Sequence, residues 1–305
     1  QSSDTPLHLA AANNLDCVVS TLLALGVPPD VCDNNGRTPL LAAARSGATQ
    51  AALLLIESGA SSWLGTPAGD TIISVAIEGK FLETLAALLA TGRVNPDLAF
   101  PDRPTPLLWV LKRFGGGKFA TRALRVLCPY GPDISKTNEA GATPLEICVQ
   151  KHLSKPDLCT AIARVKPPVP LDPDYLNAAD PLTNATFFNT FLLRGIGGAA
   201  AGMLELGADP TIRAAKQTEP VFVTAVRKGL IELAFPLLTL HKDTVHEPGL
   251  NNISPIMVAA TRKDPFEVRF WFKAFITFGL DIHAIRMPEQ QVEADAEALE
   301  LIGHH

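Results

Sequence analysis

Glycine-rich segments beside basic residues are the first places where this chain could do chemistry. The triplet Gly115–Gly117 is followed directly by Lys118, and a glycine-rich turn before a helix can hold phosphate on its backbone N–H groups. A P-loop has the spacing G-x-x-x-x-G-K-[ST], however, and Phe119 stands where a hydroxyl should coordinate magnesium. No strand-like segment precedes the triplet. The sequence therefore favours a flexible, basic turn between two helices over a nucleotide site.

The remaining residues that could do chemistry form no recognised set. The run "GIGGAAAG", Gly195–Gly202, partly matches a dinucleotide fingerprint, but it follows a helix-like segment and has no β-α-β context. The seven histidines show no H-E-x-x-H spacing, and no Ser-His-Asp or Cys-His set can be nominated. We therefore expect no catalytic residues, no metal site and no cofactor.

Composition narrows the class of protein. The chain has 305 residues, is 47% hydrophobic and carries a net charge of -5, which favours a folded protein and argues against nucleic acid as the partner. The most apolar stretch, 187–208, contains two charges and five glycines, so we expect no membrane insertion.

The cysteines are odd in number and scattered, which indicates a reduced, intracellular protein, either cytoplasmic or nuclear. They are Cys17, Cys32, Cys128, Cys148 and Cys159.

A motif recurs along nearly the whole chain. The segments "DTPLHLAAA", "GRTPLLAAA" and "GDTIISVAI" place Thr5, Thr38 and Thr71 at a period of 33 residues. Further units begin at Thr105, Thr143 and, less clearly, Thr186, and prolines alone mark two more, in "EPVFVTAVRKG" and "SPIMVAATRKD". The chain thus holds about eight degenerate repeats of one approximate length.

Each unit reads as two helices. A threonine before a proline can cap a helix, and proline fits the first turn because the backbone N–H that it lacks has no partner there. The alanines that follow keep this first helix thin. The second helix is apolar over most of its surface, as in Ala52–Ile56, because it packs against helices on both sides. One unit cannot bury these faces alone, so the stack is the folding entity. Glycines that would end the second helices are Gly26, Gly59, Gly92, Gly207 and Gly279.

These motifs resemble the ankyrin-repeat family, whose consensus carries T-P-L-H-x-A-A, a glycine, a pair of leucines and G-A-D. The resemblance implies an all-α solenoid of stacked helix-turn-helix units with short projecting hairpins or loops, which we call fingers. It implies a structural hydrogen-bonding role for His8. The fingers are expected at 33–37, 63–70, 99–103, 137–142 and 214–219. Prolines in "LGTPAGD" and "AFPDRP" predict irregular loops there.

The domain organisation follows from the repeats. We expect repeats 1–5 in 1–164, a proline-rich insertion in 165–185, and repeats 6–8 in 186–288. The insertion is either a loop that bulges from the stack or a boundary between two sub-arrays. An acidic, amphipathic capping helix is expected at 289–305, covering the aromatic segment "FEVRFWFKAFITFG".

The resemblance implies non-catalytic recognition of a protein or peptide on the concave ankyrin surface, by a monomer or by part of a larger complex. Trp63 is the foremost candidate contact, because exposed aromatic residues often anchor interfaces. The candidates, chosen by their position in the repeat, are Asn34, Asn35, Arg37, Arg45, Trp63, Glu78, Asp102, Arg103, Trp109, Lys112 and Arg113.

Basic residues recur at the ends of the first helices. Cations stabilise a helix C-terminus by roughly 0.3–1 kcal/mol each, which explains them structurally. The alternative is a positive stripe that steers an acidic or phosphorylated partner. The residues are Arg45, Lys112, Arg113, Lys151, Arg194, Arg227, Lys228, Arg262 and Lys263.

Two other functions remain open. The chain begins almost directly on a repeat, which suggests a targeting or regulatory segment of a larger enzyme whose catalytic domain lies outside it. A weaker hypothesis is intrinsic enzymatic activity, with a nucleotide at the glycine triplet.

Overall fold

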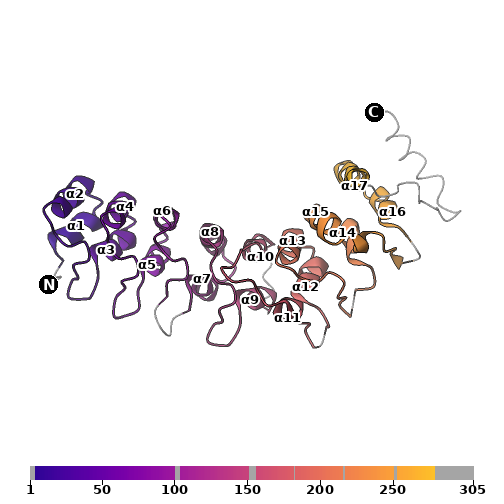
Figure 1. Cartoon of the computed structure of the whole chain (residues 1–305), viewed down its shortest axis with the longest axis horizontal. Helices are drawn as coiled ribbons and strands as arrows, with labels where there is room; N and C mark the ends of the chain where they lie inside the picture. The colour runs from indigo at the N-terminus through magenta and orange to yellow at the C-terminus, as the bar shows by residue number, and fades with distance from the viewer. Residues whose placement is uncertain are drawn as a thin grey trace. The chain divides into compact units, whose positions relative to one another are not determined.

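The structure is a computed structural model that describes residues 4–99, 104–150, 156–181, 183–215, 217–250 and 253–278. The described residues form helices and turns, with no strand among them (Figure 1). This confirms the predicted all-α class. No helix in the described ranges is long and apolar enough to cross a membrane. The predicted capping helix at 289–305 and Gly279 lie outside the described residues.

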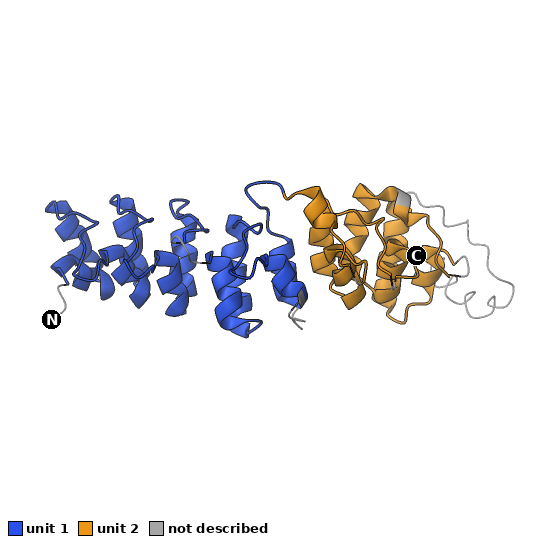
Figure 2. Cartoon of the chain, turned by 90° about the horizontal axis from the view of Figure 1, so that it is seen from below, with its two compact units in different colours: residues 1–170 blue, residues 171–305 orange. Residues whose placement is uncertain are grey.

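The chain divides into two compact units, Gln1–Pro170 and Leu171–His305 (Figure 2). The division falls inside the proline-rich segment 165–185. In unit 2 this segment includes a short helix, α11 (Pro173–Asn177). Asp172 caps α11, because its carboxylate accepts the N–H of Asp174 at 3.0 Å.

Unit 1 is a stack of antiparallel helix pairs. The first helices lie on one side of this stack and the second helices on the other, with the fingers projecting beyond the first helices (Figure 1). The pairs are α1 (Pro6–Ala12) with α2 (Asp16–Ala24), α3 (Pro39–Ser46) with α4 (Thr49–Glu57), α5 (Ile72–Glu78) with α6 (Leu82–Ala90), α7 (Pro106–Phe114) with α8 (Lys118–Leu127) and the 3-10 turn η1 (Cys128–Tyr130), and α9 (Pro144–Gln150) with α10 (Pro156–Ala163).

Unit 2 repeats the helix pair in a less regular form. Its pairs are α12 (Phe187–Arg194) with α13 (Gly197–Glu205), α14 (Val221–Lys228) with η2 (Ile231–Leu233) and α15 (Ala234–Leu240), and α16 (Pro255–Ala260) with α17 (Pro265–Thr277), while η3 (Lys242–Val245) follows α15. The run Gly195–Gly202 forms the turn between α12 and α13 and the start of α13, so its structural interpretation is confirmed.

The repeat threonines cap the first helices as predicted. The Oγ1 of Thr38 accepts the N–H of Leu41 at 3.2 Å, and Thr71 accepts that of Ser74 at 3.1 Å. Pro39 follows Thr38 in the first turn of α3, where no N–H is required. The second helices are followed by glycines in the left-handed region, with φ of 84° at Gly26, 92° at Gly59, 67° at Gly92 and 99° at Gly207.

Alanine and leucine dominate the core of unit 1, whereas aromatic rings enter the core of unit 2. Trp271 and Phe275 of α17 are buried and pack against Phe222 of α14. Phe266 and Phe278 are exposed by 65% and 36%. A helix packed on one side leaves part of its circumference exposed, and the segment 289–305 that we expect to cover these aromatic residues lies outside the described residues.

The described fingers are closed turns rather than hairpins. The N–H of Asp33 donates to the carbonyl of Arg37 at 2.9 Å, and the same bond joins Thr66 to Asp70 at 3.0 Å. The prediction of an irregular loop in "LGTPAGD" is wrong. Thr66 takes the role that Asp33 has in the first finger: its hydroxyl accepts the N–H of Asp70 at 3.2 Å. The backbone bonds that close this turn are donated by Thr66 and Gly69, so Pro67, which has no N–H, does not disturb them.

Fingers 33–37 and 66–70 touch at Gly36. A Cβ at Gly36 would lie 2.6 Å from Cδ of Pro67, whereas a Cβ at Gly92 would meet nothing within 4 Å. Both glycines have nearly the same φ, 69° and 67°. We expect Gly36→Ala to lower the free energy of unfolding by about 2–4 kcal/mol and Gly92→Ala by about 1–2 kcal/mol, because only the former adds a steric clash to the backbone strain.

Urea unfolding followed by circular dichroism measures both variants of this pair. Equal losses would show that the two fingers do not pack as described.

The five cysteines are free thiols, of which Cys17 and Cys32 are exposed. Burial raises the pKa of Cys128 from 9.0 to about 12. The hydrogen bond with Cys159, together with burial, raises the pKa of Cys148 well above 9.0. The folded state therefore keeps protons that the unfolded chain releases above pH 9, and its stability must fall as the pH rises from there toward 12.

We expect a thiol reagent at pH 8 to modify Cys17 and Cys32 in the native protein and all five cysteines in urea. Between pH 9 and 10.5 the free energy of unfolding should fall by up to about 1.4 kcal/mol per pH unit for each buried thiol. Cys128→Ala should reduce this slope. Rapid native modification of Cys128 or Cys148, or a flat alkaline profile, would contradict the burial of these thiols.

Candidate functional site

The candidate residues of unit 1 lie along its fingers and first helices. Asn34 and Asn35 are exposed at the tip of finger 33–37, and Arg37 at its end is half-buried. Arg45, Glu78, Lys112 and Arg113 are exposed near the ends of α3, α5 and α7. Asp102 and Arg103 lie outside the described residues.

The first finger presents its tip on a rigid turn. The Asp33 carboxylate accepts the N–H groups of Asn35 and Arg37, each at 2.8 Å. Desolvation works to raise the pKa of Asp33, but these backbone donors outweigh it and hold the pKa below the usual value. The buried carboxylate thus orders the turn that carries the exposed side chains of Asn34 and Asn35.

Polar side chains link each repeat to the next. The imidazole Nε2 of His8 lies 2.8 Å from the carbonyl oxygen of Arg37, and its Nδ1 lies 2.9 Å from the hydroxyl of Thr5, which confirms the structural role implied for His8. In unit 2, Asn189 replaces the histidine, and its amide donates to the carbonyl of Ile212 at 2.6 Å. These bonds attach a first helix to the finger that follows it.

A second series of links lies eight residues before the N-cap threonines. There Asp30 accepts the N–H of Ser61 at 2.9 Å, and Asp97 accepts that of Asp133 at 2.9 Å. Desolvation raises the pKa of Asp97, although the Asp133 N–H partly opposes the shift. Both aspartates therefore stabilise the stack through the backbone of the next repeat.

Trp63 occupies the same register position in the intervening repeat, eight residues before Thr71. Its side chain is exposed by 67% and makes no ring contact or hydrogen bond with the described residues. The neighbouring Ser62 makes the link to the next repeat instead, since its hydroxyl donates to the carbonyl of Arg93 at 2.7 Å. A large apolar ring thus lies in solvent at a position that other repeats use for stacking.

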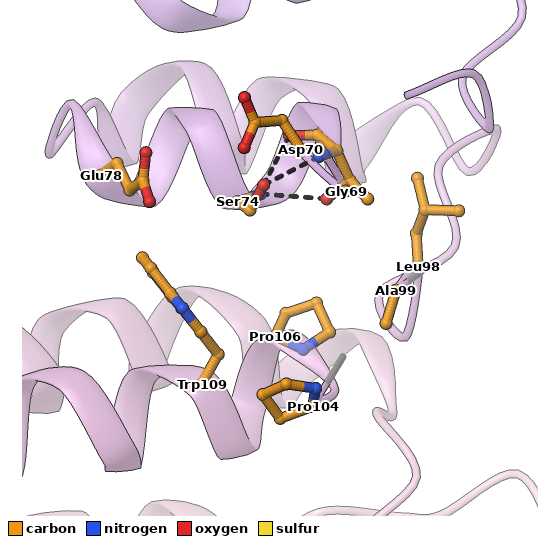
Figure 3. Close-up of a pocket in the computed structure, with 10 residues that line it drawn as sticks. Gly69, Asp70, Ser74, Glu78, Leu98, Ala99, Pro104, Pro106 and Trp109 are labelled. Atoms are coloured by element: carbon orange, nitrogen blue, oxygen red, sulfur yellow. Dashed lines mark hydrogen bonds between the residues drawn. The ribbon is translucent and has the colours of Figure 1, made fainter. Parts of the chain in front are cut away.

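A groove of about 50 Å³ lies between α5 and α7. Figure 3 shows Ser74 and Glu78 of α5 on one wall and Pro106 and Trp109 of α7 on the other, with Trp109 reaching toward Glu78. Its remaining lining residues are Gly69, Asp70, Thr71, Leu98, Ala99 and Pro104. Of the sequence candidates the groove brings together Glu78 and Trp109.

Of the two carboxylates that line the groove, Asp70 forms an ion pair and Glu78 does not. The Asp70 carboxylate forms an ion pair with Arg45 at 2.8 Å, so its charge is largely compensated. Glu78 is exposed and forms no ion pair with any described residue. Trp109 is half-buried and packs edge-on against Phe114 at 5.8 Å, which orients the indole. The groove therefore offers one uncompensated carboxylate beside an ordered aromatic ring.

The basic residues do not form a free positive stripe. Arg45 and Lys112 each pair with an acidic residue of the following finger, and the Lys112 Nζ lies 2.9 Å from Glu139. Arg113 lies over the neighbouring Phe114 ring at 5.7 Å. In unit 2, Arg227 pairs with Glu219, and Arg262 pairs with Glu267. Carboxylates thus neutralise four of the nine basic residues, while Lys151 lies outside the described residues.

The described residues bear on the chemistry that the sequence had suggested. The described residues contain no group of three or more His, Cys, Asp and Glu side chains that could hold a metal ion. Gly115–Gly117 connects α7 to α8 as predicted, and Phe114 and Phe119 pack across it at 4.7 Å. Sequence reasoning missed the contribution of Asp70, Ser74 and the prolines to the groove, because the spacing of α5 from α7 is not encoded by any motif.

Comparison with known families agrees with this geometry. Residues 1–66 match a family model described as ankyrin repeats in three copies. This part of the chain is an array of ankyrin repeats. The described helices beyond residue 66 continue the pairing of first and second helices, consistent with an ankyrin helical solenoid. Ankyrin repeats generally mediate interactions between proteins. No curated protein matches the chain.

The exposure of Trp63 has a direct consequence for stability. We expect Trp63→Ala to change the free energy of unfolding by less than about 0.5 kcal/mol, because little apolar surface leaves a packed environment. Leu55→Ala, at a fully buried position of α4, should lower it by about 2–5 kcal/mol. Urea unfolding compares them. A loss above about 1.5 kcal/mol for Trp63→Ala would assign this ring to the core.

Proposed function

We propose that this chain is a non-catalytic recognition module that binds a protein or peptide on the concave surface formed by ankyrin fingers and first helices. The matched ankyrin repeats support interaction with a protein as the general role. The candidate surface extends over the fingers of unit 1 and includes the exposed ends of α3, α5 and α7. Its function is to hold a partner through many small contacts around a few aromatic anchors.

The observation that carries the proposal is Trp63. Aspartates at this register link the repeats at Asp30 and Asp97, whereas here Ser62 makes the link and the register position carries an exposed tryptophan. An exposed indole also costs free energy in water unless a partner covers it. Recognition of a partner explains both features, because buried tryptophans are among the strongest contributors to interface affinity.

An acidic or phosphorylated partner receives less support from the charges. Arg45 and Lys112 already face carboxylates of the next finger, and a phosphate would have to displace these pairs. We therefore propose a partner selected by aromatic and carboxylate contacts rather than by a basic surface. The free thiols of the chain suit the reducing environment of the cytoplasm or nucleus, where we propose that it acts.

A selection experiment tests the proposal. The folded full chain is immobilised and used to select binders from a random dodecapeptide library, and the selected peptides are measured by titration calorimetry. We expect Trp63→Ala or Trp109→Ala to weaken the tightest binders by about tenfold or more, since removal of an interface tryptophan commonly costs at least 1.4 kcal/mol.

Matched control variants lie on the second helices. Gln50 of α4 and Glu83 of α6 are exposed and belong to the opposite side of the stack, so Gln50→Ala and Glu83→Ala should leave the affinities unchanged. The proposal fails if selection yields no binder. It also fails if binders respond to these controls and not to Trp63 or Trp109.

A further inference from the structure

We propose that the groove between α5 and α7 is a specificity pocket for an arginine side chain of the partner. This inference rests on the proposed recognition function and deepens it by naming the chemistry of one contact. The pocket combines the uncompensated carboxylate of Glu78 with the oriented indole of Trp109, and prolines and Leu98 provide an apolar boundary (Figure 3).

The size of the groove suits the end of an arginine. A cavity of 50 Å³ has room for about four water molecules, and a guanidinium group has four heavy atoms. The groove is bounded at one end by Leu98 and Ala99 and along its floor by Pro104 and Pro106 (Figure 3), and these surfaces can contact the methylene groups of the incoming side chain.

The charge of the groove favours a cation. Glu78 faces Trp109 across the groove and forms no ion pair with the described residues, so an anionic ligand would meet an uncompensated negative charge. The nearby cation, Arg45, forms an ion pair with Asp70 at 2.8 Å. Lys112, one turn beyond Trp109 on α7, is held by Glu139. Arg45 and Lys112 are thus paired with other carboxylates, Arg113 lies over the Phe114 ring, and Glu78 forms no ion pair with the described residues.

The aromatic ring favours arginine over lysine. A planar guanidinium can stack on an indole while its N–H groups donate to a carboxylate beside the ring, whereas an ammonium group is compact and strongly hydrated. Phe114 packs edge-on against Trp109 at 5.8 Å and restrains the indole before any ligand arrives. Ser74 is not available as a competing donor, because its hydroxyl donates to the carbonyl of Thr71 at 3.0 Å.

The probe for this pocket is N-acetyl-L-arginine amide, with N-acetyl-L-citrulline amide as its uncharged counterpart of the same shape. Each is titrated into the full chain while the indole N–H resonances of the three tryptophans are followed by NMR. Trp109→Phe assigns the Trp109 resonance, and that of the exposed Trp63 provides an internal control for unspecific stacking. We expect saturable movement of the Trp109 resonance by arginine amide, with a dissociation constant on the order of millimolar.

Citrulline amide should bind at least about fivefold more weakly, because it lacks the charge that the ring and the carboxylate recognise. Glu78→Gln should weaken arginine amide about fivefold or more and abolish its preference over citrulline amide. The matched variant Glu83→Gln, an equally exposed position on α6, should retain both. Glu78 is exposed, so its replacement leaves the core intact, and unchanged resonances of Trp63 and Trp271 in the free variant verify the fold.

The two proposals fail separately. If arginine amide leaves the Trp109 resonance unmoved, or if citrulline amide binds equally well, the arginine pocket is refuted, while peptide binders sensitive to Trp63→Ala would still support the recognition function. Equal movement of the Trp63 and Trp109 resonances would likewise refute it, because it would show unspecific stacking. Selected peptides rich in arginine whose affinity falls with Glu78→Gln would support both proposals.

Discussion

The structure depends on the burial of apolar faces between successive helix pairs, because no pair can bury both of its faces by itself. Alanine-rich first helices such as α3 allow close approach, and the second helices supply leucine to the interior. This dependence makes each unit a one-dimensional stack in which every repeat is stabilised by its neighbours. The polar links of His8, Asp30 and Asp97 hold the fingers in register with this apolar stack.

A stack built in this way separates stability from recognition. The core and the links use the inner faces of the helices and the bases of the fingers, whereas the finger tips and the exposed side of the first helices are left free to vary. Trp63 shows the separation most clearly, because an indole replaces a linking aspartate and Ser62 supplies the missing bond. Glu78 likewise lies outside the ion pairs that join Arg45 and Lys112 to the following fingers.

The fold could be predicted in detail from the sequence because its signals are local. The threonine N-caps, the glycines after the second helices and the turn at Gly115–Gly117 each depend on a few adjacent residues, and the structure confirms them. The finger at 66–70 was predicted wrongly for a physical reason. Pro67 suggested a broken turn, but a threonine hydroxyl can accept the same backbone N–H as an aspartate carboxylate, and the proline lies where no donor is needed.

The sequence alone determined the repeat and the helix pair, since a 33-residue period and capping residues are properties of the chain. Only the tertiary structure decided which exposed residues act together. It paired Arg45 with Asp70, left Glu78 without a described partner, and separated α5 from α7 enough to form a groove beside Trp109. These outcomes depend on distances between side chains of different repeats, which local propensity does not specify.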